Sequence, residues 1–379
     1  MNKFYYCKKC ILPSTRPNIS YNLKTELCSV CAQITKSKVE INWKKRKKEF
    51  ERLIAKNKKK NYLYDCVIPV SGGKDSTWQV VNALKYKLKP LCVTWKTPSR
   101  SRIGSKNLQN LIDLGVSHID FTINQKIEKK FILKSFIKYG EPLIPMHMAM
   151  HAIPTQIAVK FKVPLVLWAE NSRNEYGSKK IIINEKYLTN QWRKLFGNTK
   201  STTSRDWVDK EMTTKDMSPY IWLDEKTKKK NNVKEIFLGY FFKWDPLKIF
   251  NISKKNGFEP AAKPKTGIYN FADIDDEFLV TIHHWLKWYK FGFTRSWDNL
   301  SIEIRKGRIT REKAIESIKK IGQEVPYKEI NLFCKYLGIS NKNFYRIIEK
   351  FRNKNIWHKE KNIWKIKNFL IKDWNWSQK

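Results

Sequence analysis

Short apolar runs alternate with longer amphipathic segments in the central part of the chain. The short runs are rich in β-branched residues and predict four buried strands, at 65–70, 90–95, 118–123 and 164–169. The segments between and beside them carry apolar residues at helical spacing and predict helices at 76–89, 105–116, 126–140 and 148–162. Pro154 should open or kink the last of these helices. Strands separated by helices of this length indicate parallel βαβ units with right-handed crossovers, so the fold class is predicted to be α/β.

The pattern changes on both sides of this region. We expect a short cysteine-bearing module at 1–38, a Lys-rich linker helix at 39–62 and the α/β domain at 63–280. A polar, aperiodic insertion is expected inside that domain, at about 178–233. After Thr281 the chain becomes Trp-rich with helical spacing, which predicts a helical C-terminal region at 281–379.

Composition narrows the class of protein. The chain has 379 residues, of which 41% are hydrophobic, enough to build a core and to exclude wholesale disorder. The net charge of +41 favours anionic partners, although Lys is abundant throughout and most of it is expected to be solvated. No signal-like apolar segment follows Met1, and no apolar run is long enough to span a bilayer. We therefore expect a cytoplasmic protein without membrane insertion.

A glycine-containing loop joins the first predicted strand to the helix that follows it. Its six residues are Ser71, Gly72, Gly73, Lys74, Asp75 and Ser76. Glycines let the backbone approach phosphate oxygens closely, and the N–H groups that open a helix attract an anion. Lys74 adds a point charge, and Asp75 suits this place if it binds Mg²⁺ or positions an N–H. The alternative is an ordinary strand-to-helix turn with N-caps, which the strand–loop–helix context disfavours.

This loop resembles the pyrophosphate loop (PP-loop) of the N-type ATP pyrophosphatases, a superfamily that includes asparagine, GMP and NAD synthetases and several tRNA-modifying enzymes. The resemblance implies a parallel sheet of the adenine nucleotide alpha hydrolase-like type. It also implies cleavage of ATP to AMP and pyrophosphate, with Lys74 and Asp75 in catalytic roles and 71–76 as the ATP-binding loop.

Four of the seven cysteines form two CxxC pairs near the start of the chain, Cys7 with Cys10 and Cys28 with Cys31. Seventeen residues separate the pairs, a spacing typical of a structural Zn²⁺ site with four thiolates. A redox pair or an iron–sulfur cluster remains an alternative. Cys66, Cys92 and Cys334 lie in predicted strands or a helix, where small core residues are expected.

The two motifs together resemble the N-acetyl sugar amidotransferase family, which makes acetamidino sugars for bacterial O-antigen and for pseudaminic or legionaminic-type glycans. The resemblance rests on ILPSTRPNI between the cysteine pairs, VSGGKDSTWQV at the loop, and later segments such as IPMHMAMHAIPTQIAVKFK and FLGYFFKWDP. It covers most of the chain and is weakest at 178–233 and beyond Trp357.

The family implies a specific reaction. The oxygen of a sugar acetamido group attacks the α-phosphate of ATP, an O-adenylyl imidate forms, and ammonia displaces AMP to leave an acetamidino group. The substrate implied is a nucleotide-activated N-acetyl sugar, and ATP is used with Mg²⁺. Separate glutaminase and cyclase-like subunits would supply the ammonia, because no cysteine here sits in a nucleophile elbow.

Further residues are candidates for substrate binding. Glu170, Asn171 and Glu175 follow the fourth predicted strand, and ligands of open parallel sheets bind at the carboxyl ends of strands. Lys263 and Arg295 are cations suited to a diphosphate, as are Lys265 and Arg305. His147 and His151 favour packing or substrate contact over metal binding, because no third ligand is evident. His283 and His284 lie among tryptophans, a cluster that favours a place in the core over a platform for sugar stacking.

Two other functions remain open. A tRNA-modifying enzyme of the same superfamily, of the thiolation or lysidine type, would use the basic charge for RNA. The second is a nucleic-acid-binding protein in which the loop merely binds nucleotide. In addition, 326–352 resembles a helix-turn-helix that reads DNA. The bulky apolar residues of its second helix favour a packing role there, so nucleic acid is not the expected partner.

Overall fold

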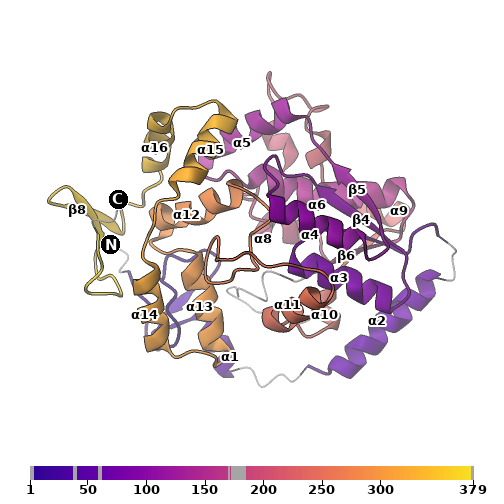
Figure 1. The fold of residues 1–379 in the computed structure, drawn as a ribbon, viewed down its shortest axis with the longest axis horizontal. Helices are drawn as coiled ribbons and strands as arrows, with labels where there is room; N and C mark the ends of the chain where they lie inside the picture. The colour runs from indigo at the N-terminus through magenta and orange to yellow at the C-terminus, as the bar shows by residue number, and fades with distance from the viewer. Residues whose placement is uncertain (1–3, 37–40, 59–61, 170, 172–184, 377–379) are drawn as a thin grey trace.

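A five-stranded sheet forms the framework of the α/β region in the computed structural model, which describes residues 4–36, 41–58, 62–169, 171 and 185–376; the sheet lies on the right in Figure 1. Every neighbouring pair of strands is parallel, and the spatial order is β5-β4-β3-β6-β7. The strands are β3 (Cys66–Pro69), β4 (Pro90–Trp95), β5 (Ser117–Phe121), β6 (Leu165–Trp168) and β7 (Lys234–Phe237). The predicted α/β class is confirmed.

Helices cover both faces of the sheet because alternate strand residues point to opposite sides. In β3, Val67 belongs to one hydrophobic core, whereas Cys66 and Ile68 belong to the other. One face is covered by α2 (Trp43–Lys58), α3 (Lys74–Lys85), α4 (Arg102–Ile112), α10 (Leu238–Phe241) and α11 (Pro246–Lys255). The other face is covered by α5 (Gln125–Tyr139) and α6 (Ile144–Lys160). Helix α6 continues through Pro154 instead of ending there.

The segment expected as a polar insertion is part of the main core from residue 185 onward. It contains α8 (Asn190–Phe196), the 3₁₀ turns η1 (Ser204–Trp207) and η2 (Ser218–Tyr220), and α9 (Glu225–Lys230). Trp192, Trp207 and Tyr220 are buried against α5 and α6. The start of the predicted insertion, up to residue 184, lies outside the described residues.

The C-terminal region is helical, as predicted, and ends in a hairpin. Its elements are α12 (Leu279–Phe291), α13 (Arg295–Arg305), α14 (Arg311–Ile321), α15 (Tyr327–Leu337), α16 (Asn341–Glu349), β8 (Trp357–Glu360) and β9 (Ile363–Ile366). In the helix-turn-helix candidate, Phe344 and Ile348 of α16 are fully buried against Phe333 and α5. The packing interpretation of that segment is confirmed.

The cysteine module is docked on the C-terminal helices (Figure 1). It consists of β1 (Tyr21–Asn22), β2 (Leu27–Cys28) and α1 (Ser29–Lys36). The Thr15 hydroxyl donates to the Phe291 carbonyl oxygen at 2.5 Å, and Arg311 Nε donates to the Cys10 carbonyl oxygen at 3.1 Å. The two ends of the chain are therefore parts of one packed unit. Within the described residues, no helix combines the length and apolar character needed to cross a bilayer.

Candidate active site

The glycine loop joins β3 to α3 at the carboxyl ends of the strands, in the middle of the sheet. Here the strand order changes direction, because β4 and β5 follow on one side of β3, whereas β6 and β7 lie on the other side. Gly72 has φ +83° and lies against α4, so that a Cβ there would come within 2.5 Å of the Leu108 backbone nitrogen. Both the conformation and the close approach therefore require glycine at this position. In open α/β sheets, such a reversal point is where ligands bind.

We expect Gly72→Ala to lower the free energy of unfolding by about 2 kcal/mol or more, because it adds the strain of a left-handed alanine to a backbone clash. Gly115→Ala is a matched control: Gly115 has φ +91° but nothing lies within 4 Å of its added Cβ. Chemical denaturation of both variants measures the difference. Equal destabilisation would contradict the close packing of the loop on α4.

The first turn of α3 is open toward the loop. Gly73 is the N-cap and has no side-chain cap bond, and Gly73, Lys74 and Asp75 line a cavity at this end of the helix. The N-terminus of a helix favours an anion in such a position. The hydroxyls of Ser76 and Thr77 both donate to the Gly73 carbonyl oxygen, at 2.9 and 3.1 Å. These bonds fix the shape of the turn. The Ser71 side chain accepts a bond from the Gly73 N–H at 3.3 Å.

Lys74 is held beside this turn rather than extended into solvent. Its side chain is 9% exposed, its Nζ lies 2.5 Å from Asp75 Oδ1, and its ammonium lies 5.6 Å from the centre of the Phe271 ring. The Lys74 carbonyl oxygen accepts a bond from the Ser253 hydroxyl of α11 at 2.6 Å. The charge of Lys74 is thus placed at the opening of α3.

A second acidic group approaches the loop from residues 273–276, which the sequence analysis did not single out. Burial, together with the charges of Asp276 and Asp273, raises the pKa of Asp275 to about 6, while a bond with Ser71 opposes this rise. Asp276 accepts bonds from the hydroxyls of Thr97 and Ser99, at 2.6 and 2.8 Å. The acidic run DIDD in the sequence was the available signal for this segment.

Three cavities meet around these residues, and Asp273 and Arg295 line all three. The loop cavity, about 230 Å³, is lined by Ser71, Gly73, Lys74, Asp75 and Asp275, among others. The strand-end cavity, about 440 Å³, lies at the carboxyl ends of β3, β4 and β6 and reaches His151 and Trp168. The basic cavity, about 460 Å³, lies between α6, α12 and the cysteine module. The three cavities are neighbours that share Asp273 and Arg295 as lining residues, and polar and apolar side chains line each of them.

The basic cavity is named for its cations. Six basic side chains line it, against the three carboxylates of Glu141, Asp273 and Asp298; they are Arg16, Lys194, Lys200, Lys287, Lys290 and Arg295. Asp298 pairs with Lys287 at 3.1 Å and with Arg16 at 3.2 Å. Burial alone would raise the pKa of Asp298, but Lys287 and Arg16 lower it well below its usual range. The surplus of positive charge suits an anionic ligand.

Both histidine pairs of the sequence analysis line these cavities. His147 lies on α6 on the wall shared by the strand-end and basic cavities. His151, one turn later, is 5% exposed and packs on Trp168 with ring centres 5.0 Å apart. His283 and His284 of α12 lie on the wall of the basic cavity rather than wholly in the core. His283 Nδ1 forms a short bond with Glu141.

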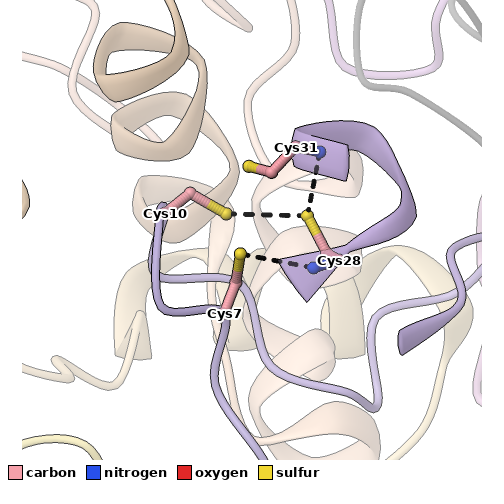
Figure 2. A group of neighbouring side chains, drawn as sticks. All are labelled: Cys7, Cys10, Cys28 and Cys31. Atoms are coloured by element: carbon pink, nitrogen blue, oxygen red, sulfur yellow. Dashed lines mark hydrogen bonds between the residues drawn. The ribbon is translucent and has the colours of Figure 1, made fainter. Parts of the chain in front are cut away.

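The four cysteines of the N-terminal module converge on one point (Figure 2). All four side chains are buried, and their Sγ atoms lie within 4.8 Å of one another. The Sγ atoms of Cys10 and Cys28 are 3.8 Å apart, close to the separation of about 3.8 Å that tetrahedral thiolates bound to zinc adopt. The backbone N–H groups of Cys28 and Cys31 donate to sulfur. The group can hold a tetrahedral metal ion, and among the described residues it is the one set of three or more metal-ligating side chains that converges in this way.

The other predicted site residues fall in different places. Arg295 lines all three cavities described above, and its role in binding a substrate stays a prediction. Lys263 is exposed and lines none of the three. Asn171 is buried, donates to Glu185 at 2.8 Å and accepts from Trp192 at 3.3 Å, so it supports the fold beside the site. Glu170 and Glu175 lie outside the described residues.

Comparisons with known proteins bear most directly on the C-terminal region. Residues 266–370 match the family model described as "LPS biosynthesis protein WbpG-like, C-terminal domain". A stretch of 123 residues is 32% identical to the uncharacterized protein MJ1599 of Methanocaldococcus jannaschii. That match takes in 31% of this chain and 43% of the relative, so the chain spans less than half of the relative's length.

Two solved structures are similar to part of the fold. NMN synthetase from Francisella tularensis has 13% identity and a TM-score of 0.36, covering 74% of this chain and 93% of that one. The NH₃-dependent NAD synthetase from Campylobacter jejuni has 18% identity and a TM-score of 0.27, covering 59% and 100%.

The matched family domain begins just before Asp273 and includes α12 and α13. It therefore contributes the acidic run beside the glycine loop and three of the six cations of the basic cavity, Lys287, Lys290 and Arg295. Residues 266–370 of this chain are therefore similar to the C-terminal domain of WbpG-like LPS biosynthesis proteins, and they pack beside the glycine loop of the α/β core.

Proposed function

We propose that this protein is an ATP-dependent amidotransferase that converts the acetamido group of a nucleotide-activated N-acetyl sugar to an acetamidino group, in the biosynthesis of surface polysaccharide. The observation that carries the proposal is that a loop of the phosphate-binding type lies next to a cavity lined by cations. One volume suits ATP, and the adjoining volume suits a second anionic substrate.

ATP fits the loop and strand-end cavities. The open N-terminus of α3 and Lys74 would bind the β- and γ-phosphates, and the apolar strand-end cavity beside Trp168 would take the adenosine. Asp75, Asp273 and Asp275 line the loop cavity and offer oxygen ligands of the kind Mg²⁺ takes, where the ion would neutralise phosphate charge. Lys74 would stabilise the charge that develops on departing pyrophosphate.

The acceptor sugar fits the basic cavity. Its phosphate groups would pair with the cations there, and its acetamido group would then lie at the wall shared with the strand-end cavity, near the α-phosphate of ATP. The amide oxygen attacks the α-phosphorus and pyrophosphate leaves. Ammonia then replaces AMP. Glutaminase and cyclase-like subunits are the proposed source of ammonia, and the cysteine group is the proposed site of a structural Zn²⁺.

The first experiment combines purified protein, MgATP and ammonium with a panel of UDP- and CMP-activated N-acetyl sugars, and follows AMP and product mass together. Release of AMP coupled to replacement of oxygen by NH in one sugar is the expected result. Formation of AMP with bulk tRNA, and with none of the sugars, would instead favour the RNA-modifying function. Lys74→Ala protein, purified in the same way, is the control that measures AMP formed by contaminating enzymes.

Arg16 provides a test of where the acceptor binds. Its guanidinium is 12% exposed, lines the basic cavity and pairs with Asp298. We expect Arg16→Ala to raise the KM for the acceptor about tenfold while leaving the KM for ATP nearly unchanged, because the loop is unaffected. Lys24→Ala, an exposed lysine of the same module, is the matched control. A larger effect on the KM for ATP than on that for the acceptor would place the acceptor elsewhere.

A further inference from the structure

One wall separates the strand-end cavity from the basic cavity, and only a few side chains on it can exchange protons. The residues that line both cavities are Met146, His147, Phe196, Asn198, Asp273, Val280 and Arg295. Three of these are titratable: His147, Asp273 and Arg295. A reaction between ligands in the two cavities would take place beside this wall.

Asp273 and Arg295 are poorly suited to accept a proton there. Asp273 Oδ2 accepts a bond from the Thr266 hydroxyl at 2.7 Å and lies 3.8 Å from Arg295 Nε and 3.5 Å from His284 Nδ1. Its negative charge is therefore matched by neighbouring donors. Arg295 is a permanent cation and has no lone pair to offer.

His147 is oriented differently, because its own helix fixes the tautomer. Its Nδ1 lies 2.8 Å from the Leu143 carbonyl oxygen, which also accepts the His147 backbone N–H at 3.0 Å. A carbonyl oxygen can only accept, so Nδ1 carries the hydrogen and, in the neutral ring, Nε2 carries a lone pair. Burial and the nearby His283 lower the pKa of His147 to about 4, although the Leu143 bond and Glu141 oppose the shift. The neutral form with an available Nε2 thus predominates at neutral pH.

We propose that His147 is the general base of the adenylylation step, accepting at Nε2 the proton of the acceptor's amide N–H as the amide oxygen attacks ATP. This inference rests on the proposed function. It adds a proton acceptor to a site whose sequence motifs supply only phosphate-binding groups, and it explains why a histidine is tied to its own helix at the wall between the two cavities.

The step balances without another reactant. The amide N–H bond breaks, its proton goes to Nε2 and its electron pair forms the C=N bond of the imidate. The π pair of the carbonyl forms the bond to the α-phosphorus, and the bond from phosphorus to pyrophosphate breaks with its electrons on pyrophosphate. When ammonia adds to the imidate carbon, the imidate nitrogen takes the proton back from His147. AMP then leaves with the C–O electron pair, and the added nitrogen loses one proton to water.

The test measures acceptor-dependent pyrophosphate release at saturating ammonium, using the sugar nucleotide that the wild-type protein turns over. We expect His147→Ala to lower kcat about 10²-fold, with the KM for ATP changed less than about threefold, and imidazole to restore part of the rate in proportion to its free-base concentration. His147→Asn can still hydrogen-bond but is not basic, and it should be as slow as the alanine variant.

Met146→Ala is the matched control, since Met146 lines the same two cavities and has no basic atom. Imidazole should not accelerate it. Full activity of His147→Asn, absence of imidazole rescue in His147→Ala, or equal rescue of Met146→Ala would each overturn the assignment. If the wild-type protein releases no pyrophosphate with any sugar nucleotide while Lys74→Ala behaves identically, the proposed function fails and the base role fails with it.

Discussion

Lys74→Ala is expected to lower kcat for pyrophosphate release by about 10²- to 10³-fold, the largest kinetic effect expected of any single substitution in the site. The Lys74 ammonium is nearly buried beside the open N-terminus of α3, so it would act on phosphate charge in a site with little water. No other lysine or arginine contributes to the loop cavity except Arg295, within the part of the chain that the structure describes. Few other side chains could therefore replace the positive charge that Lys74→Ala removes from the loop cavity.

Lys85→Ala is the matched control, because Lys85 is an exposed lysine at the other end of the same helix. It should keep wild-type kcat. Circular dichroism and thermal unfolding should show that Lys74→Ala remains folded, and Asp75→Ala should lose pyrophosphate release as well. Wild-type turnover by both Lys74→Ala and Asp75→Ala would disprove the assignment of the loop as the ATP site.

Cys28→Ser is expected to release bound zinc and to lower the free energy of unfolding by about 4 kcal/mol or more. The four thiols are fully buried and close enough to bind one ion. Loss of one thiolate would remove a ligand of that ion and with it the metal's contribution to the stability of the module. Metal analysis of the purified protein and denaturant titration measure the two effects. Treatment of the wild-type protein with a chelator should reproduce the loss of stability.

Cys334→Ser separates metal binding from the burial of a thiol. Cys334 is 3% exposed in the core between α12 and α15, away from the metal-binding group, and burial raises the pKa of its thiol to about 11. This variant should retain zinc and lose less stability than Cys28→Ser. Absence of zinc from carefully purified wild-type protein would refute the proposed metal site.

Much of the α/β core was predictable because its strands are buried on both faces. Continuous apolar runs such as PLCVTW and PLVLWA are distinctive, and the ends of each run agree with those of an observed strand to within two residues. β7 was missed because it begins with the charged Lys234 and Glu235 and its last two residues merge with α10 in one apolar run, where neither period can be recognised. The C-terminal hairpin was missed although NIW occurs twice in it. The turn between its strands places Lys361 and Asn362 at positive φ, a conformation that Asn tolerates.

The site was predictable only where consecutive residues form it. The loop at 71–76 and the CxxC pairs are local motifs, and the structure assembles each of them as expected. Arg16, His147 and Asp273 come from segments far apart in the chain and meet only through tertiary packing. Among many basic residues, no sequence pattern distinguishes Arg295, which lines the cavities, from Lys263, which does not.

The pair between Arg16 and Asp298 joins residues 282 positions apart, and this separation has a consequence for synthesis of the chain. Contacts between distant residues form late in folding, and a chain leaving the ribosome orders its N-terminal part first. The glycine loop can thus form while the basic cavity still lacks one side. The loop cavity is also lined by Arg295, Asn299 and Ile302 of α13. Under the proposed function, a growing chain would therefore complete neither the ATP site nor the acceptor site until α13 has been made and has docked on the cysteine module.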